Sequence, residues 1–200
     1  MHTIDGNTSM TGIILSGGKN FRMGENKAFL KVRGERIIER TVGIFRKIFK
    51  ETIIVTNDPL AYLEFDVKIA TDIFPGKGPL GGLYTGLFFS SFGFAFVTSC
   101  DMPFLNSEFI LYMKKHEKNY DILVPSPADG IQPLHAVYSK RCLHPIKKLI
   151  EKDLLKIRGF YKHCKYIEIP DSIIRSFDEE GKMFLNLNCR DDLENIVCTS

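Results

Sequence analysis

A short apolar segment runs directly into a glycine-rich turn near the amino end of the chain. The segment, residues 13–16, reads Ile-Ile-Leu-Ser, and the turn that follows carries Gly17, Gly18, Arg22, Gly24 and Lys27. Glycines leave backbone N–H groups exposed, and such groups bind phosphate oxygens well. Arg22 can donate two parallel hydrogen bonds to a phosphate, whereas Lys27 supplies a point charge. The stretch therefore predicts that a polyphosphate binds at the end of a strand.

This turn differs from the two commonest phosphate-binding patterns. Its glycines do not lead into the Gly-Lys-Ser/Thr of a P-loop, and they do not form the Gly-x-Gly-x-x-Gly of a dinucleotide-binding turn. The alternative interpretation is a glycine-rich turn that carries two exposed cations. The combined spacing Gly-Gly-x-x-x-Arg-Met-Gly-x-x-Lys favours phosphate binding.

Short apolar runs alternate with helical patterns along the chain. Unbroken apolar runs indicate strands covered on both faces, and apolar residues at i, i+3/4 and i+7 indicate helices. We predict strands at 12–16, 52–56, 67–70, 94–98, 122–124, 134–138 and 166–169, and a last short one at 184–187. We predict helices at 36–49, 80–90, 107–118 (capped by Ser107), 141–151, 153–163 and 191–197, a short helix at most at 59–64, and a Gly/Pro-rich loop at 71–82. This alternation predicts an α/β fold with a mostly parallel sheet.

The composition excludes several classes of protein. A net charge of +3 without a run of Lys and Arg argues against a nucleic-acid partner, and no stretch of about 18 apolar residues suggests a membrane span. The cysteines are odd in number and scattered, at Cys100, Cys142, Cys164, Cys189 and Cys198. That pattern argues against a disulfide framework or a zinc site and favours reduced thiols in the cytoplasm.

No linker, repeat or low-complexity tract divides the chain. We therefore expect one domain over residues 11–198, preceded by a loose leader at 1–10. We expect a monomer or a weak homo-oligomer.

Polar residues follow three of the predicted strands. Asp101 directly follows the strand at 94–98, and a carboxylate there can bind Mg²⁺ together with phosphate oxygens and water. Asp72 can accept hydrogen bonds from a purine, and Asn57 can contact a base or ribose. The alternatives are that Asp101 caps the next turn and that Asp72 and Asn57 form turns. Because ligands bind beyond the carboxyl ends of parallel strands, we expect Gly17, Gly18 and Asp101 on one edge of the sheet.

The loop at 78–82, Gly-Pro-Leu-Gly-Gly, allows two interpretations. Its backbone can approach a flat ligand closely, or it is a tight connection before a helix. No histidine stands in a catalytic arrangement, and His135 fits a core or rim residue better than a base. A phosphate monoester is already anionic near neutral pH and needs no general base to act as a nucleophile. Positioning of two phosphates by cations then accounts for the chemistry.

The amino-terminal motif resembles a known signature. Leu15-Ser-Gly-Gly-x-x-x-Arg22-Met-Gly24-x-x-Lys27 is similar to that of nucleotidyltransferases which transfer a nucleoside monophosphate to a phosphorylated acceptor. Within these, the chain is most similar to the molybdenum cofactor guanylyltransferase family. Further stretches agree in order, namely Asn57, Asp72 before Gly-Pro-Leu-Gly-Gly, Ser99-Cys-Asp101-Met-Pro103, and Phe184-Leu-Asn-Leu-Asn188. The resemblance covers about residues 11 to 197.

The resemblance implies a fold, a reaction and a set of site residues. It implies a three-layer Rossmann-like sandwich with a mostly parallel, mixed sheet, of the nucleotide-diphospho-sugar transferase type. It implies Mg²⁺-dependent transfer of GMP from GTP to molybdopterin-bound molybdenum cofactor, with release of pyrophosphate, and it leaves room for cofactor-delivery or acceptor proteins as partners. The implied nucleotide contacts are Leu15, Ser16, Gly17, Gly18, Lys27, Asn57, Asp72 and Asp101, with Arg22 on the phosphates, Asp101 on the metal, and Asn186 and Asn188 near the pterin.

Three positions depart from the family pattern. Asn26 stands where an aspartate often precedes the lysine, Gln132-Pro133 replaces His-Pro, and Cys189-Arg190 replaces Thr-Pro. The last two departures fall in the stretches that the resemblance places beside the acceptor rather than beside the nucleotide. The alternatives therefore remain a related transferase that uses CTP or another phosphorylated acceptor, and a non-catalytic nucleotide-binding module.

Overall fold

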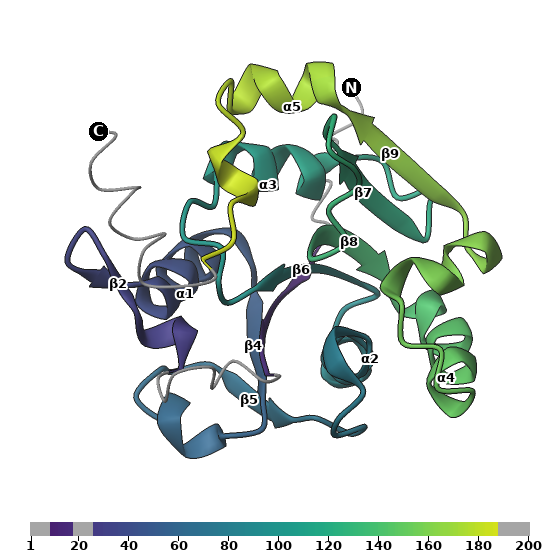
Figure 1. Ribbon diagram of the computed structural model, residues 1–200, viewed down its shortest axis with the longest axis horizontal. Helices are drawn as coiled ribbons and strands as arrows, with labels where there is room; N and C mark the ends of the chain where they lie inside the picture. Colours follow the sequence, from purple (N-terminus) through teal and green to yellow (C-terminus); the bar gives the residue numbers. More distant parts are fainter. Residues whose placement is uncertain (1–8, 18–25, 188–200) are drawn as a thin grey trace, which may run out of the picture.

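A computed structural model describes residues 9–17 and 26–187, and seven of their strands form one large sheet (Figure 1). Its order is β5-β4-β1-β6-β8-β7-β9. The strands are β1 (Thr11–Ser16), β4 (Glu51–Thr56), β5 (Lys68–Thr71), β6 (Phe94–Ser99), β7 (Ile122–Ser126), β8 (His135–Ser139) and β9 (Tyr166–Pro170). β8 runs antiparallel to both neighbours, and the other pairings are parallel. The predicted mostly parallel, mixed sheet is confirmed.

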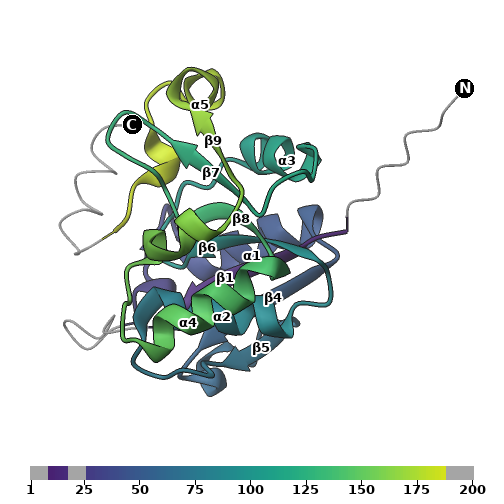
Figure 2. The same ribbon diagram turned by 90° about the vertical axis from the view of Figure 1, so that its right-hand side faces the viewer.

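Helices cover both faces of this sheet (Figure 2). The helices are α1 (Ile37–Ile48), α2 (Gly78–Phe89), α3 (Ser107–Lys115), α4 (Leu143–Glu151) and α5 (Asp171–Phe177). The buried residues of α1, α3 and α5 pack on one face, and those of α2 and α4 pack on the other. The three-layer sandwich is therefore confirmed. In the described ranges, no helix is long and apolar enough to cross a membrane.

Short elements connect these layers. A hairpin of β2 (Lys31–Val32) and β3 (Glu35–Arg36) follows the 3₁₀ helix η1 (Lys27–Phe29). Further 3₁₀ helices are η2 (Pro59–Tyr62), η3 (Lys140–Cys142), η4 (Ile157–His163) and η5 (Lys182–Phe184). The hairpin and α5 were not predicted, because two-residue strands and a seven-residue helix are too short for a clear hydrophobic period.

Several predicted boundaries were wrong. The helix expected at 153–163 is only η4, because Asp153 has a φ of 57° and breaks the helical path. The strand expected at 184–187 is absent, since Phe184 ends η5 and the chain then continues without pairing in the described residues. α3 is capped by Asn106 rather than by Ser107, because the Asn106 side chain accepts a hydrogen bond from the Phe109 N–H at 3.0 Å.

Three other expectations need correction or lie beyond the structure. The loop expected to extend to residue 82 ends earlier, because α2 begins at Gly78. Met10 is fully buried in the core, so packing begins within the expected leader. The helix expected at 191–197 lies outside the described residues.

α2 lies unusually close to the central strand β1. A Cβ added to Gly86 would stand 2.6 Å from the Ile13 side chain, and one added to Gly82 would stand 3.3 Å from Leu15. Such distances leave no room for a methyl group at Gly86. The glycines of α2 therefore allow the helix to approach the sheet and bring its first turn to the carboxyl edge of β1.

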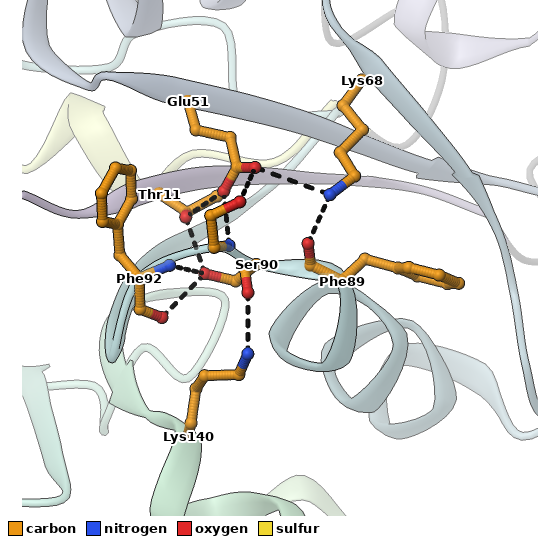
Figure 3. Close-up of polar contacts among 8 residues, drawn as sticks. Thr11, Glu51, Lys68, Phe89, Ser90, Phe92 and Lys140 are labelled. Atoms are coloured by element: carbon orange, nitrogen blue, oxygen red, sulfur yellow. Dashed lines mark hydrogen bonds and ion pairs between the residues drawn. The ribbon is translucent and has the colours of Figure 1, made fainter.

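A half-buried carboxylate ties together the opposite edge of the sheet (Figure 3). Glu51 accepts hydrogen bonds from the Thr11 hydroxyl at 2.6 Å and from the Ser91 N–H and hydroxyl at 2.8 and 2.7 Å. Lys68 lies 3.6 Å away and also donates to the Phe89 carbonyl. Burial raises the pKa of Glu51, but the three hydrogen bonds lower it by more, so the net pKa lies below 4.5. The starts of β1, β4 and β5 are thereby fixed to the turn after α2.

We predict that Gly86→Ala destabilises the protein by about 1–3 kcal/mol, because the new methyl group overpacks the contact with Ile13. Gly43→Ala is the matched control, since its Cβ position in α1 has no atom within 4 Å. That change should stabilise α1 by about 0.5–1 kcal/mol. Urea unfolding of both variants measures the difference, and equal effects would contradict the close approach of α2.

We predict that Glu51→Gln lowers the free energy of unfolding at pH 7 by about 2 kcal/mol, because an amide cannot accept all three hydrogen bonds. A carboxylate with a lowered folded-state pKa stabilises the fold above its unfolded pKa of about 4.5, and this stabilisation is lost as the pH falls. The variant should therefore converge with wild type in urea unfolding at acid pH. Glu151→Gln, at the exposed end of α4, is the control and should unfold like wild type.

Candidate functional site

Four parallel strands end at one edge of the sheet, and the polar residues predicted for the site follow them. The register pairs Ser16 at the end of β1 with Thr56, which directly precedes Asn57. Asp72 follows β5 and Asp101 lies just beyond β6, at the same edge. A Cβ on Gly17 would lie 3.8 Å from Asn57 Nδ2, so these two residues are neighbours. The predicted common edge is confirmed, whereas the roles of these residues stay predictions.

Asp101 carries a buried carboxylate oxygen that lacks a partner. Its Oδ1 is buried without a hydrogen bond in the described part of the chain. The backbone around it is firmly held, because the Cys100 N–H donates to the Leu15 carbonyl at 3.0 Å and the Leu187 N–H donates to the Asp101 carbonyl at 2.9 Å. A capping carboxylate would use its oxygens on backbone donors. An unpaired, buried acceptor instead indicates a group that receives its partner from outside.

The donor set suits Mg²⁺ better than a transition metal. In the described ranges, no group of three His, Cys, Asp or Glu side chains could hold a metal ion. Mg²⁺ does not need such a cage, because it takes one or two carboxylates and completes its shell with phosphate oxygens and water. Asp101 Oδ1 fits this requirement as a single protein ligand.

Lys27 acts electrostatically on Cys100, the residue that precedes Asp101. Burial raises the pKa of the Cys100 thiol to about 12, and a hydrogen bond from Ser16 and the positive charge of Lys27 act in the opposite direction. Lys27 is thus near enough to Cys100 to affect the pKa of its thiol. It begins η1, whose preceding residue Asn26 accepts a hydrogen bond from the Ala28 N–H at 3.1 Å. Gly18 and Arg22 lie outside the described residues.

Asp72 forms a turn and also faces the first turn of α2. Its Oδ1 accepts hydrogen bonds from the Phe74 N–H at 3.0 Å and the Thr85 hydroxyl at 2.9 Å. This is the turn-forming role that the sequence offered as an alternative. A Cβ on Gly81 would lie 3.2 Å from Asp72 Oδ2 and 2.9 Å from the Phe74 carbonyl, so only glycine fits there. The segment 78–82 therefore combines a helix start with a close backbone approach.

His135 is excluded as a base. It is fully buried in β8, and its ring lies 5.0 Å from Phe96, 5.9 Å from Phe109 and 5.2 Å from Phe184. Burial lowers its pKa to about 3, so the imidazole stays neutral. The prediction that His135 belongs to the core is confirmed.

The carboxy-terminal segment returns to the same edge. The Leu187 N–H binds the Asp101 carbonyl, and Leu187 is buried against Val32 and Ile37. Asn186 is exposed beside this anchor, while Asn188, Cys189 and Arg190 lie outside the described residues. Gln132 lies in the turn between β7 and β8 and donates its N–H to the Pro125 carbonyl at 2.9 Å.

Two features of this edge were not predicted. Tyr62, in η2, contacts both Ser16 and Asn26 with its hydroxyl. Its only signal in the sequence is its place in a short helix after a strand.

The second feature is a cavity of about 290 Å³ between the ends of β7, α5 and η5, with Asp129, Asp178 and Glu179 in its lining. Its acidic lining makes it unfavourable for a phosphate.

Comparisons with known proteins agree with this architecture. Residues 12–166 match the MobA-like NTP transferase domain. The chain is 35% identical over 188 residues to the molybdenum cofactor guanylyltransferase of Desulfosudis oleivorans, with 93% of each protein covered. It is 36% identical over 191 residues to a probable molybdenum cofactor guanylyltransferase of Clostridium perfringens, which covers 92% of this chain and 94% of the relative. The structure of molybdopterin-guanine dinucleotide biosynthesis protein A from Archaeoglobus fulgidus superposes with a TM-score of 0.81 at 27% identity, covering 95% of this chain and 99% of that one.

We predict that Asp101→Ala leaves the free energy of unfolding within about 0.5 kcal/mol of wild type or raises it, because a buried, unpartnered oxygen disfavours folding. Asn106→Ala is the control, since that side chain caps α3. The control should lose about 1 kcal/mol in urea unfolding. An equal loss in Asp101→Ala would show that Asp101 caps a turn instead.

Proposed function

This chain belongs to the molybdenum cofactor guanylyltransferase family, and from that premise we propose that it transfers GMP from GTP to the terminal phosphate of molybdopterin-bound molybdenum cofactor, with release of pyrophosphate. The observation that carries the proposal is the unpartnered Oδ1 of Asp101 at the edge where β1, β4, β5 and β6 end. A nucleotidyl transfer needs a divalent cation at such an edge, next to the triphosphate.

In this proposal the nucleoside lies across the ends of the parallel strands. Leu15, Ser16, Gly17 and Gly18 line the guanine and ribose, with Asn57 and Asp72 as polar contacts. Guanine presents N–H donors on its Watson–Crick edge, and a carboxylate oxygen is their natural acceptor. Asp72 Oδ1 already accepts two hydrogen bonds, so its Oδ2 is the oxygen we assign to the base.

The triphosphate requires positive charge, which lysine and arginine side chains supply. Lys27 acts electrostatically on Cys100, next to Asp101 in the chain, and we assign it with Arg22 to the phosphate oxygens. Asp101 would hold Mg²⁺, and the metal would supply positive charge to those oxygens. Asp101 and Lys27 thereby orient the α-phosphate for attack and support departure of pyrophosphate.

No side chain needs to remove a proton from the acceptor. The nucleophile is the terminal phosphate of the pterin, which is anionic near neutral pH. This agrees with the burial of His135, the histidine of β8. We propose that the acceptor approaches from the side of Asn186 and Gln132, where the carboxy-terminal segment meets Asp101.

We further propose that residues 11–198 act as one domain in the cytoplasm. The odd number and scattered positions of the five cysteines support a reducing compartment. Proteins that deliver the cofactor or receive it are further partners in this proposal.

The test is an assay of pyrophosphate release with molybdopterin cofactor, Mg²⁺ and each of GTP, CTP, ATP and UTP. We predict that GTP is consumed, that chelation of Mg²⁺ stops the reaction, and that Asp101→Ala lowers kcat/KM by at least about 100-fold. Asp66→Ala, in the exposed turn before β5, is the control and should keep the wild-type rate.

Two outcomes would contradict the proposal. Consumption of CTP instead of GTP would favour the cytidylyl alternative. Activity of Asp101→Ala within about threefold of wild type, a change of less than ~1 kcal/mol in the barrier, would remove the metal assignment.

A further inference from the structure

One buried hydroxyl joins the two chain segments that flank the phosphate-binding turn. Tyr62 is fully buried, and its Oη hydrogen-bonds the Ser16 hydroxyl at the end of β1. The same Oη accepts a hydrogen bond from Asn26 Nδ2 at 2.8 Å. The described chain stops at Gly17 and resumes at Asn26. Tyr62 therefore connects the last residues before this interval to the first residues after it.

The contacts of Asn26 indicate a direction for the hydrogen bonds in this connection. Asn26 Oδ1 accepts from the Ala28 N–H at 3.1 Å, so its Nδ2 is the group that faces Tyr62. Because Oη accepts from Asn26, the Tyr62 proton is available for Ser16 Oγ, its other contact. Ser16 can then donate its own proton to the Cys100 thiol, with which it also hydrogen-bonds. Each hydroxyl donates once and accepts once along this path.

The Tyr62 ring reinforces the same connection. It lies 5.1 Å from the ring of Phe29, which is the last residue of η1, and 6.4 Å from Phe65. Burial raises the pKa of Tyr62, so its hydroxyl keeps its proton near neutral pH. η1, which begins with Lys27, is thus held to Tyr62 at its start by a hydrogen bond and at its end by ring packing.

We propose that Tyr62 is a positioning residue for the nucleoside triphosphate, which fixes Lys27 relative to the backbone at the end of β1. The proposal rests on the proposed function, in which Lys27 and the Ser16–Gly17 backbone contact the same GTP molecule. Phosphate oxygens are bound well only when the cation and the backbone donors stand at a fixed separation. A hydroxyl that spans both segments sets this separation before the nucleotide arrives, so that binding costs less ordering.

The first experiment compares Tyr62→Phe with Tyr161→Phe. Both tyrosines are buried and both share a hydroxyl–hydroxyl hydrogen bond, since Tyr161 bonds Tyr138 at 2.7 Å in the core beneath α2 and α4. We expect Tyr62→Phe to raise the KM and the Kd for GTP by about fivefold, the loss that one buried hydrogen bond typically gives. We expect kcat to change by less than about twofold, because the backbone at Asp101 keeps its bond to Leu187 and Lys27 still reaches the phosphates once GTP is bound.

The control separates positioning from stability. Tyr161→Phe should lower the melting temperature about as much as Tyr62→Phe but leave the KM for GTP unchanged. If both variants raise the KM equally, the effect of Tyr62 is merely structural and the proposal fails. If Tyr62→Phe keeps the wild-type KM, the proposal also fails.

A double-mutant cycle tests whether the two hydroxyls act through their mutual bond. Ser16→Ala removes the other partner and keeps the backbone of β1. If the bond carries the effect, the double variant Ser16→Ala with Tyr62→Phe loses no more GTP affinity than the larger single loss. Losses that multiply would show independent contributions and overturn the proposal.

Binding of GTP to the wild-type protein, measured first by calorimetry with Mg²⁺, separates this proposal from the proposed function. Wild-type protein that binds no GTP overturns both. Wild-type protein that binds GTP, together with a Tyr62→Phe variant of equal affinity, overturns only the role of Tyr62.

Discussion

The parallel backbone pairing of β1 with β4 and β6 is the constraint on which the rest of this structure depends. Every residue of β1 is buried, and both neighbours run in its direction, so their carboxyl ends meet at one edge. The Cys100 N–H extends this pairing by one bond to the Leu15 carbonyl. Because of that bond, Asp101 emerges beside the end of β1 rather than further along the edge. A slip of one residue would invert every side chain of β1 and separate the polar residues that now share an edge.

The carboxylates at the two edges of the sheet differ in how their hydrogen bonds are satisfied. At the amino edge, Glu51 accepts three hydrogen bonds, and its carboxylate is satisfied within the fold. At the carboxyl edge, Asp101 Oδ1 is buried with no partner among the described residues, an arrangement that disfavours folding. Figure 3 shows the polar contacts that join Glu51 to Thr11 and Lys68 at the amino edge.

The sequence was most informative where the pattern is local. The apolar run of β6 and the glycine pair after β1 define strand ends without any knowledge of neighbours, so the common edge could be predicted. Asp153 could not be recognised as a helix break, because a positive φ at a non-glycine residue leaves no mark in the hydrophobic period. His135 could be assigned to the core from its apolar strand, although its ring contacts come from distant segments. Tyr62 was beyond prediction, since its two partners lie 46 and 36 residues away and only the folded sheet brings them together.

The position of Asp101 divides the functional edge into two halves. β6 pairs in parallel with β1 on one side and antiparallel with β8 on the other, so the sheet changes direction at the strand that leads to this carboxylate. The strand order also reverses beside β1, since β4 and β5 extend the sheet on one side of it and β6 lies on the other. In open α/β sheets, ligands bind at such a reversal. The parallel half, with Asn57 and Asp72, is the half that we assign to the nucleotide. The mixed half receives the carboxy-terminal segment, whose Leu187 N–H binds the Asp101 carbonyl itself. One residue thus meets both halves, with a side-chain oxygen that we assign to a cation and a backbone fixed to the segment that we assign to the acceptor. Two phosphates brought from opposite sides would meet at this residue, which is the arrangement that in-line transfer between them requires.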